Sequence, residues 1–105
     1  MRTISACPDE ATIIGFLLRL RAACKAQRVQ VTTAAAQDAE DIGYDFAAIL
    51  AQLQTLRLPD FEKRVSSTRR PDDQVWVFCP EALSCKLWIR LIERGPFIVV
   101  SFHEK

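Results

Sequence analysis

Several features that mark common kinds of functional site are scarce or absent in this sequence of 105 residues. Only three glycines are present, so the chain has no glycine-rich loop of the kind that surrounds a nucleotide phosphate. The four cysteines form no Cys-x-x-Cys pair and the chain has a single histidine, which leaves too few closely spaced ligands for a structural zinc site. No paired carboxylates and no nucleophile motif stand out. We therefore expect no metal and no cofactor.

Long apolar runs and a large excess of either charge are also missing. The apolar run at 13–18 is too short to span a bilayer and is followed by Arg19, and Met1 to Thr3 lead to no signal-type apolar segment. We therefore expect a cytoplasmic protein with reduced thiols and no membrane partner. The net charge is +1, so any attraction to nucleic acid must come from the local placement of cations.

The residues that are present have the composition of an ordinary globular domain. Half of them (50%) are hydrophobic and 26% are charged. A chain of this length can bury one hydrophobic core without disulfides. It contains no internal repeat, low-complexity stretch or linker. We expect residues 1–105 to form a single domain.

Apolar spacing and capping residues predict three helices and then a series of strands. In order, the first elements are a helix from about 8 to 27, a strand at 28–32, a helix capped by Thr33 that runs to about 41, and a helix capped by Asp45 that ends before Pro59. Strands should follow at 61–67, 74–78, 86–91 and 97–105, with the longest loop at 66–73. This order predicts an α+β domain whose helices pack on one face of an antiparallel sheet.

Each of the last three strands alternates between two kinds of side chain, and alternate side chains point to opposite faces of a sheet. One set is largely aliphatic and comprises Val75, Val77, Leu87, Ile89, Leu91, Ile98, Val100 and Phe102. The other set is aromatic, cationic or polar and comprises Gln74, Trp76, Phe78, Lys86, Trp88, Arg90, Ser101, His103 and Lys105. If the strands pair, we expect the first set to line the core and the second to form an open face.

An open face of this kind suits single-stranded RNA, because bases stack on aromatic rings and phosphates attract cations. Trp76 and Trp88 are the candidates for stacking. Further RNA-binding candidates are cations on the strands and in the long loop, namely Lys86, Lys105, Arg69 and Arg70. Other interpretations remain open: a tryptophan can instead cover a neighbouring strand, and an arginine pair can be a solvated loop end.

The same strands carry residues able to cut RNA without a metal. Such cleavage needs a base for the 2′-hydroxyl, cations for the charge that grows on the phosphate, and an acid for the leaving 5′-oxygen. Imidazole titrates near neutral pH, so His103 could be the base or the acid. Lys63 and Arg90 could hold the phosphate. The alternative is that His103 is simply an exposed residue near the C-terminus.

Several short blocks in this chain resemble the MqsR family of toxins in their order and spacing. The blocks are RVQVTT at 28–33, IGYDF at 42–46, DFEK at 60–63, Trp76, and VSFHEK at 100–105. Together they cover about Cys24 to Lys105. Members of this family are ribosome-independent mRNA interferases of bacterial toxin–antitoxin pairs. The resemblance therefore implies a RelE-like fold, an antiparallel sheet with helices packed on one face.

The resemblance also implies which residues do the chemistry. The family's first lysine falls on Lys63, its middle-strand tyrosine on Trp88, and the lysine of its terminal block on His103. A family glutamine is replaced here by Val77. Trp88 can stack but cannot donate a phenolic proton, whereas His103 keeps a group that can transfer one. The implied partners are single-stranded mRNA, cut at GC-containing triplets, and a cognate antitoxin protein.

The leading hypothesis is a metal-independent, sequence-selective mRNA endoribonuclease, the toxin of a type II toxin–antitoxin pair. It would leave a 2′,3′-cyclic phosphate and a 5′-hydroxyl, with Lys63, Trp88, Arg90 and His103 as the catalytic residues. The first alternative is a binding module whose sheet holds RNA or a protein without cutting it. The second is a regulator whose scaffold docks an antitoxin-like DNA-binding protein.

Overall fold

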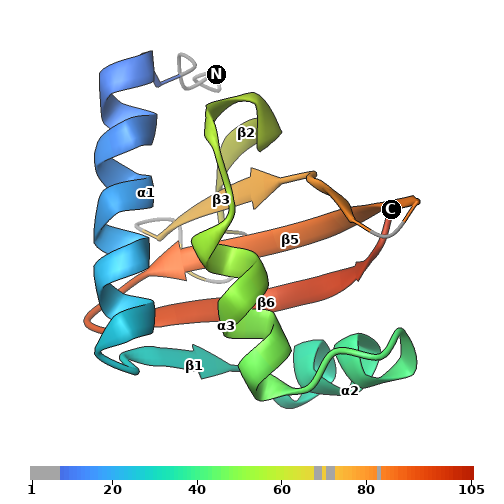
Figure 1. The fold of residues 1–105 in the computed structure, drawn as a ribbon. Helices are drawn as coiled ribbons and strands as arrows, with labels where there is room; N and C mark the ends of the chain where they lie inside the picture. Colours follow the sequence, from blue (N-terminus) through green and yellow to red (C-terminus); the bar gives the residue numbers. More distant parts are fainter. Residues whose placement is uncertain (1–7, 68–69, 71–72, 83) are drawn as a thin grey trace.

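The computed structural model describes residues 8–67, 70, 73–82 and 84–105 and shows an α+β fold (Figure 1). The helices are α1 (Glu10–Lys25), α2 (Thr33–Asp41) and α3 (Phe46–Gln54), followed by the 3₁₀ helix η1 (Leu58–Asp60). The strands are β1 (Val29–Val31), β2 (Phe61–Ser66), β3 (Gln74–Phe78), β4 (Glu81–Ala82), β5 (Cys85–Glu93) and β6 (Phe97–Glu104). None of the helices in this described part is long and apolar enough to cross a membrane.

Short polar side chains start the three α-helices by accepting a hydrogen bond from a free backbone N–H of the first turn. Asp9 caps α1 and Asp45 caps α3, and each carboxylate accepts a backbone N–H at 2.8 Å. The hydrogen bonds from Thr12 also lower the pKa of Asp9. The expected cap Thr33 is wrong by one residue, because the side chain of Thr32 accepts the N–H of Ala35.

The strands form one sheet in the order β1-β6-β5-β3-β2, and β4 forms a short ladder with the start of β5. The pairs β2–β3, β3–β5 and β5–β6 are antiparallel, as the run of strands in the second half of the chain predicted. The outermost pair, β1–β6, is parallel. The sheet is therefore mixed, because β1 comes from the helical half of the chain and joins the edge formed by the last strand.

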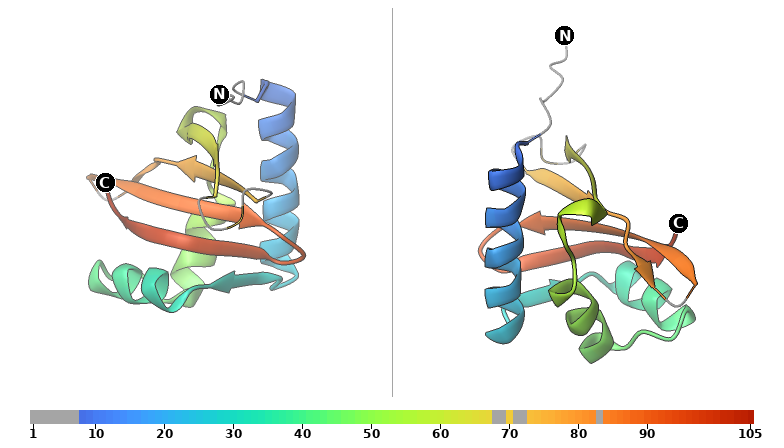
Figure 2. Two further views of the ribbon diagram at one scale, coloured as in Figure 1. Left: turned by 180° about the vertical axis from the view of Figure 1, so that it is seen from behind. Right: turned by 45° about the horizontal axis from the view of Figure 1, so that its top comes forward.

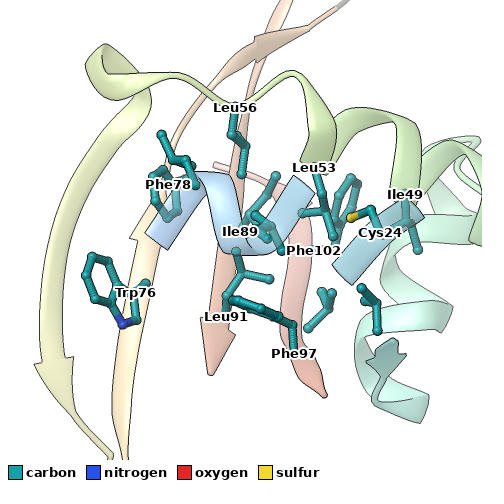
Figure 3. Close-up of a cluster of buried hydrophobic side chains, with 14 of the residues drawn as sticks. Cys24, Ile49, Leu53, Leu56, Trp76, Phe78, Ile89, Leu91, Phe97 and Phe102 are labelled. Carbon is teal, nitrogen blue, oxygen red and sulfur yellow. The ribbon is translucent and has the colours of Figure 1, made fainter. Parts of the chain in front are cut away.

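The main core lies between the helices and one face of the sheet (Figure 3). In α1 the buried residues recur at helical spacing, so one side of the helix rests on the strands. Phe16 is the centre of an aromatic group: its ring lies 4.1 Å from that of Trp76, 5.8 Å from Phe78 and 5.3 Å from Phe97, measured between centroids. The thiol of Cys24 is in the same core, and burial raises its pKa to about 11.

The pairing of β3 with β5 decides which face each tryptophan takes. Trp76 lies opposite Leu91 and Phe78 lies opposite Ile89, so both aromatic residues share the face that the helices cover. Trp76 is only 5% exposed and is stacked on Phe16. The expectation that Trp76 lies on the open face is therefore wrong, and its ring has no surface to offer a base.

The same pairing moves several aliphatic residues out of the main core. Val75 and Val77 were expected to line it, but they point to the opposite side of the sheet, where they form a small second cluster with Ile92. From here on, the open face means this side of the sheet, opposite to the side on which α1 and α3 pack. In the view from behind, β5 and β6 face the reader and α3 lies behind them (Figure 2, left).

A β-bulge changes the alternation within β6. Arg90 pairs with Ser101 but the next residue, Leu91, pairs with Val99, so Val100 is the extra residue. Val100 and Ile98 consequently pack against the second cluster on the open face, whereas the sequence pattern placed them on the core side. Phe102, Ser101, His103 and Lys105 take the sides that the pattern predicted.

Candidate functional site

Two neighbouring cross-strand rows bring the polar residues of the open face together. The first row runs from β2 to β6 and comprises Lys63, Val77, Arg90 and Ser101. The second row pairs Trp88 of β5 with His103 of β6. Directly opposite residues have Cβ atoms about 4.5–5.5 Å apart, so each row is a set of adjacent side chains. Four residues predicted to be catalytic, Lys63, Trp88, Arg90 and His103, therefore share one side of the sheet.

Trp88 carries two ammonium groups over its ring. The Nζ atom of Lys63 lies 5.5 Å from the ring centroid and that of Lys105 lies 5.8 Å from it. Both distances are within the range of a cation–π attraction. Neither lysine forms an ion pair with a carboxylate anywhere in the described residues. The half-buried indole thus holds two uncompensated positive charges near each other, and such a pair favours an anion between them.

The ring of His103 is held by a backbone group. Its Nδ1 atom lies 2.7 Å from the carbonyl oxygen of Glu104. A carbonyl oxygen can only accept, so Nδ1 must carry a proton in this contact. In the neutral ring the lone pair is then on Nε2, at the other end of the imidazole. This tautomer leaves Nε2 able to take a proton from a bound hydroxyl.

Arg90 is oriented by a hydroxyl of the neighbouring strand. Its Nε donates to Oγ of Ser101 at 2.8 Å, and Ser101 is 7% exposed. The guanidinium stays exposed, and no carboxylate of the described residues is in ion-pair contact with it. An arginine held through Nε can still present its two terminal nitrogens to the oxygens of a phosphate.

Several lysines act electrostatically on the thiol of Cys79, which lies at one end of the open face. It follows β3 and packs, half-buried, against the second cluster together with Trp88. Burial raises the pKa of the Cys79 thiol, while the charges of Lys105, Lys86 and Lys63 lower it and that of Glu62 raises it. Lys63 of β2, Lys86 of β5 and Lys105, which follows β6, therefore all act on Cys79, although the net charge of the chain is only +1.

The remaining RNA-binding candidates have different positions. Lys86 is exposed near the start of β5, two residues before Trp88. Arg70 is exposed in the connection between β2 and β3. Arg69 lies outside the described residues. Trp76 is the one candidate that the structure removes, because it is buried under α1.

Ser101 and Cys79 were not identified as site residues from the sequence. Strand alternation places Ser101 on the open face, but only the pairing of β5 with β6 shows that its hydroxyl meets Arg90. Cys79 follows the strand that ends at Phe78, where no motif marks it. Within the described part of the chain, no group of three or more His, Cys, Asp or Glu side chains is placed to hold a metal ion.

The sequence that forms this site matches a known protein family. Residues 16–104 match the family described as "Motility quorum-sensing regulator, toxin of MqsA", the MqsR toxins. The chain belongs to this family. The match includes Lys63, Trp88, Arg90, Ser101 and His103 of the open face, and it ends one residue before Lys105. No curated protein matches the chain closely enough to count as a relative.

Membership of the MqsR toxins confirms the resemblance that the short sequence blocks indicated. It makes the chain the toxin of a toxin–antitoxin pair and implies an antitoxin as its protein partner. The α+β fold expected from the order of the elements is likewise confirmed.

Proposed function

We propose that this MqsR toxin is an mRNA endoribonuclease that cuts single-stranded RNA with its own side chains. The observation that carries the proposal is that two lysines lie over the ring of Trp88, His103 is its cross-strand partner, and Arg90 lies in the neighbouring row on the same face. A positive cluster with an aromatic surface and a group that can transfer a proton has the parts that RNA cleavage requires.

The reaction begins at the 2′-hydroxyl of the nucleotide before the scissile bond. Nε2 of His103 takes the hydroxyl proton, and the 2′-oxygen forms a bond to the adjacent phosphorus. The bond from phosphorus to the 5′-oxygen of the next nucleotide breaks, and its electron pair goes to that oxygen. The oxygen is protonated by a neighbouring ammonium, for which Lys63 and Lys105 are placed, or by water. The products are a 2′,3′-cyclic phosphate and a 5′-hydroxyl.

Positive charge on the open face has its main effect as the phosphate becomes more negative in the transition state. Lys63 and Arg90 stand on either side of Val77 in one cross-strand row, so they can contact the same phosphate from β2 and β5. Groups already held in place need no rearrangement when the charge develops, which is the main source of such catalysis. Trp88 gives an adjacent base a surface for stacking.

Mapping the ends of a defined RNA after incubation with the purified protein tests the proposal. We expect internal cuts in single-stranded regions, a 5′-hydroxyl on the downstream fragment, and the same rate with and without EDTA, since no step uses a metal. The absence of cuts would favour a binding module on the same scaffold. Cleavage abolished by EDTA and restored by a divalent ion would contradict the proposed chemistry.

Removal of the Ser101 hydroxyl should weaken catalysis through Arg90. In Ser101→Ala we expect kcat/KM to fall about two- to tenfold, because one hydrogen bond contributes about 0.5–1.5 kcal/mol. Ser101→Thr keeps the hydroxyl and should restore most of the rate, while thermal unfolding should change little in either variant. A loss of rate in both variants would mean that Ser101 acts through packing and does not position Arg90.

A further inference from the structure

A groove of about 640 Å³ crosses the open face next to the candidate site around Trp88. Its floor is aliphatic and is formed by Val65, Val75, Ile92 and Val100. Three arginines, Arg70, Arg90 and Arg94, line it together with Asp73. The volume is in the range of pockets that hold one small organic ligand, so the groove fits one or two nucleotides but not a duplex.

The groove has an excess of positive charge. Arg94 forms an ion pair with Asp73, which offsets one of the three arginines. Arg70 and Arg90 are exposed, and neither has a carboxylate partner among the described residues. An apolar floor beside two guanidinium groups that have no carboxylate partner among the described residues is complementary to a nucleotide, which presents a flat ring and a phosphate.

Arg90 joins this groove to the cluster where cleavage is proposed. Trp88, Arg90 and Ile92 are alternate residues of β5 on the open face, so they are spaced roughly 7 Å apart along the strand. A chain that passes over Trp88 and continues along β5 therefore reaches Arg90 and then the aliphatic floor. This spacing is longer than the roughly 3.4 Å between stacked nucleotides, so one or two extended nucleotides cover it.

We infer that this groove binds an unpaired nucleotide of the RNA adjacent to the scissile phosphate. Its base lies on the aliphatic floor and its phosphate contacts Arg70 and Arg90. The position relative to the scissile bond rests on the proposed function, while the binding of single-stranded RNA in the groove does not. The bulge at Val100 contributes directly, because it turns that side chain and Ile98 toward the open face.

Val65 offers a direct test because it forms part of the floor and is 40% exposed, so a charged side chain can replace it at little cost to the fold. Val65→Glu places a negative charge beside the phosphate, and Val65→Lys places a positive charge at the same point. Ile14 on α1 is 45% exposed and lies on the helical side, so Ile14→Glu and Ile14→Lys are matched controls.

The probe is a fluorescein-labelled, mixed-sequence single-stranded RNA of about 12 nucleotides that carries 2′-fluorine throughout, so it has no 2′-hydroxyl to be cut. Binding is followed by fluorescence anisotropy. Val65→Glu should weaken binding about fivefold or more, and Val65→Lys should bind as well as the wild type or better. Arg70→Gln should reduce the slope of log affinity against log salt by about 0.7, the value for one lost phosphate contact.

Three results would overturn the inference. The first is equal binding by Val65→Glu, Val65→Lys and the wild type, which would show that the RNA does not enter the groove. The second is an equal loss in Val65→Glu and Ile14→Glu, which would show that only the total charge matters. The third is failure of the wild type to bind the probe. Circular dichroism melts confirm that each variant is folded.

The outcome is separable from that of the proposed function. If the wild type cuts RNA and the Val65 variants bind and cut as it does, the groove inference fails and the cleavage proposal stands. If the wild type cuts nothing but its binding responds to charge at Val65, the cleavage proposal fails and the groove binds RNA without chemistry. A substrate that is extended on the side of the scissile bond that fills the groove should be cut with a higher kcat/KM than a shorter one. Val65→Glu should remove this gain.

Discussion

His103→Ala should lower the rate of RNA cleavage by about 100-fold or more, the usual effect of removing a general base or acid. The reason is structural: Nδ1 is fixed as a donor to the carbonyl of Glu104, so Nε2 is left to take the proton of the 2′-hydroxyl. The measurement is the single-turnover rate on an RNA whose cleavage site has been mapped. In cells, the growth arrest caused by expression should disappear.

A pH profile separates a chemical role for His103 from a structural one. On the acid side, the wild-type rate should rise with pH as the base loses its proton, and this rise should be absent in His103→Gln, whose amide cannot take up a proton. Lys25→Gln, at the end of α1 on the helical side, is the control for a lost cation and should cut normally. If His103→Ala cuts as fast as the wild type, the histidine has no part in the mechanism.

Substitution of the two tryptophans by alanine should affect different properties, the stability at Trp76 and the cleavage rate at Trp88. Trp76 is 5% exposed and stacked on Phe16, so Trp76→Ala should lower the free energy of unfolding by about 3–5 kcal/mol. Trp88 is half-buried on the open face beneath two ammonium groups. Its loss should cost less stability, but it should reduce cleavage because the lysines lose the ring that holds them.

Chemical denaturation with urea and cleavage assays on the same preparations give the comparison. Phenylalanine at each position keeps an aromatic ring and should recover part of the property that alanine removes: stability at Trp76 and cleavage at Trp88. Equal destabilisation by the two alanine variants would contradict the assignment of the rings to opposite faces. Normal cleavage by Trp88→Ala would exclude the indole from the site.

Much of this fold could be predicted because it depends on local signals. Asp45 has a side chain that satisfies a free N–H group at a helix start, and it caps α3 as expected. The first helix was expected to start at about residue 8, and Asp9 caps it. The apolar spacing in α1 gave the residues that it buries. Thr32 and Thr33 are both good caps, so the choice between them depended on where β1 ends, which no local signal determines.

The shared face of the candidate site could be predicted in part for the same reason. Alternation within β5 placed Trp88 and Arg90 on one side, and alternation at the end of β6 placed Ser101 and His103 on one side. It could not show that Oγ of Ser101 meets Nε of Arg90, because a contact between strands depends on their register. The groove had no sequence signal, since it joins residues from β2, β3, β5 and β6.

The sequence by itself determined the three α-helices, the longer strands and, outside the bulge in β6, the sets of side chains that share a side within each strand. These depend on the local geometry of the backbone, which repeats every 3.6 or 2 residues. The tertiary structure alone decided which set faces the helices. Trp76 and Trp88 fall in similar patterns, yet Trp76 is paired with Leu91 and buried, while Trp88 is paired with His103 on the open face. Only the register of neighbouring strands carries that information, and a single bulge at Val100 is enough to change it.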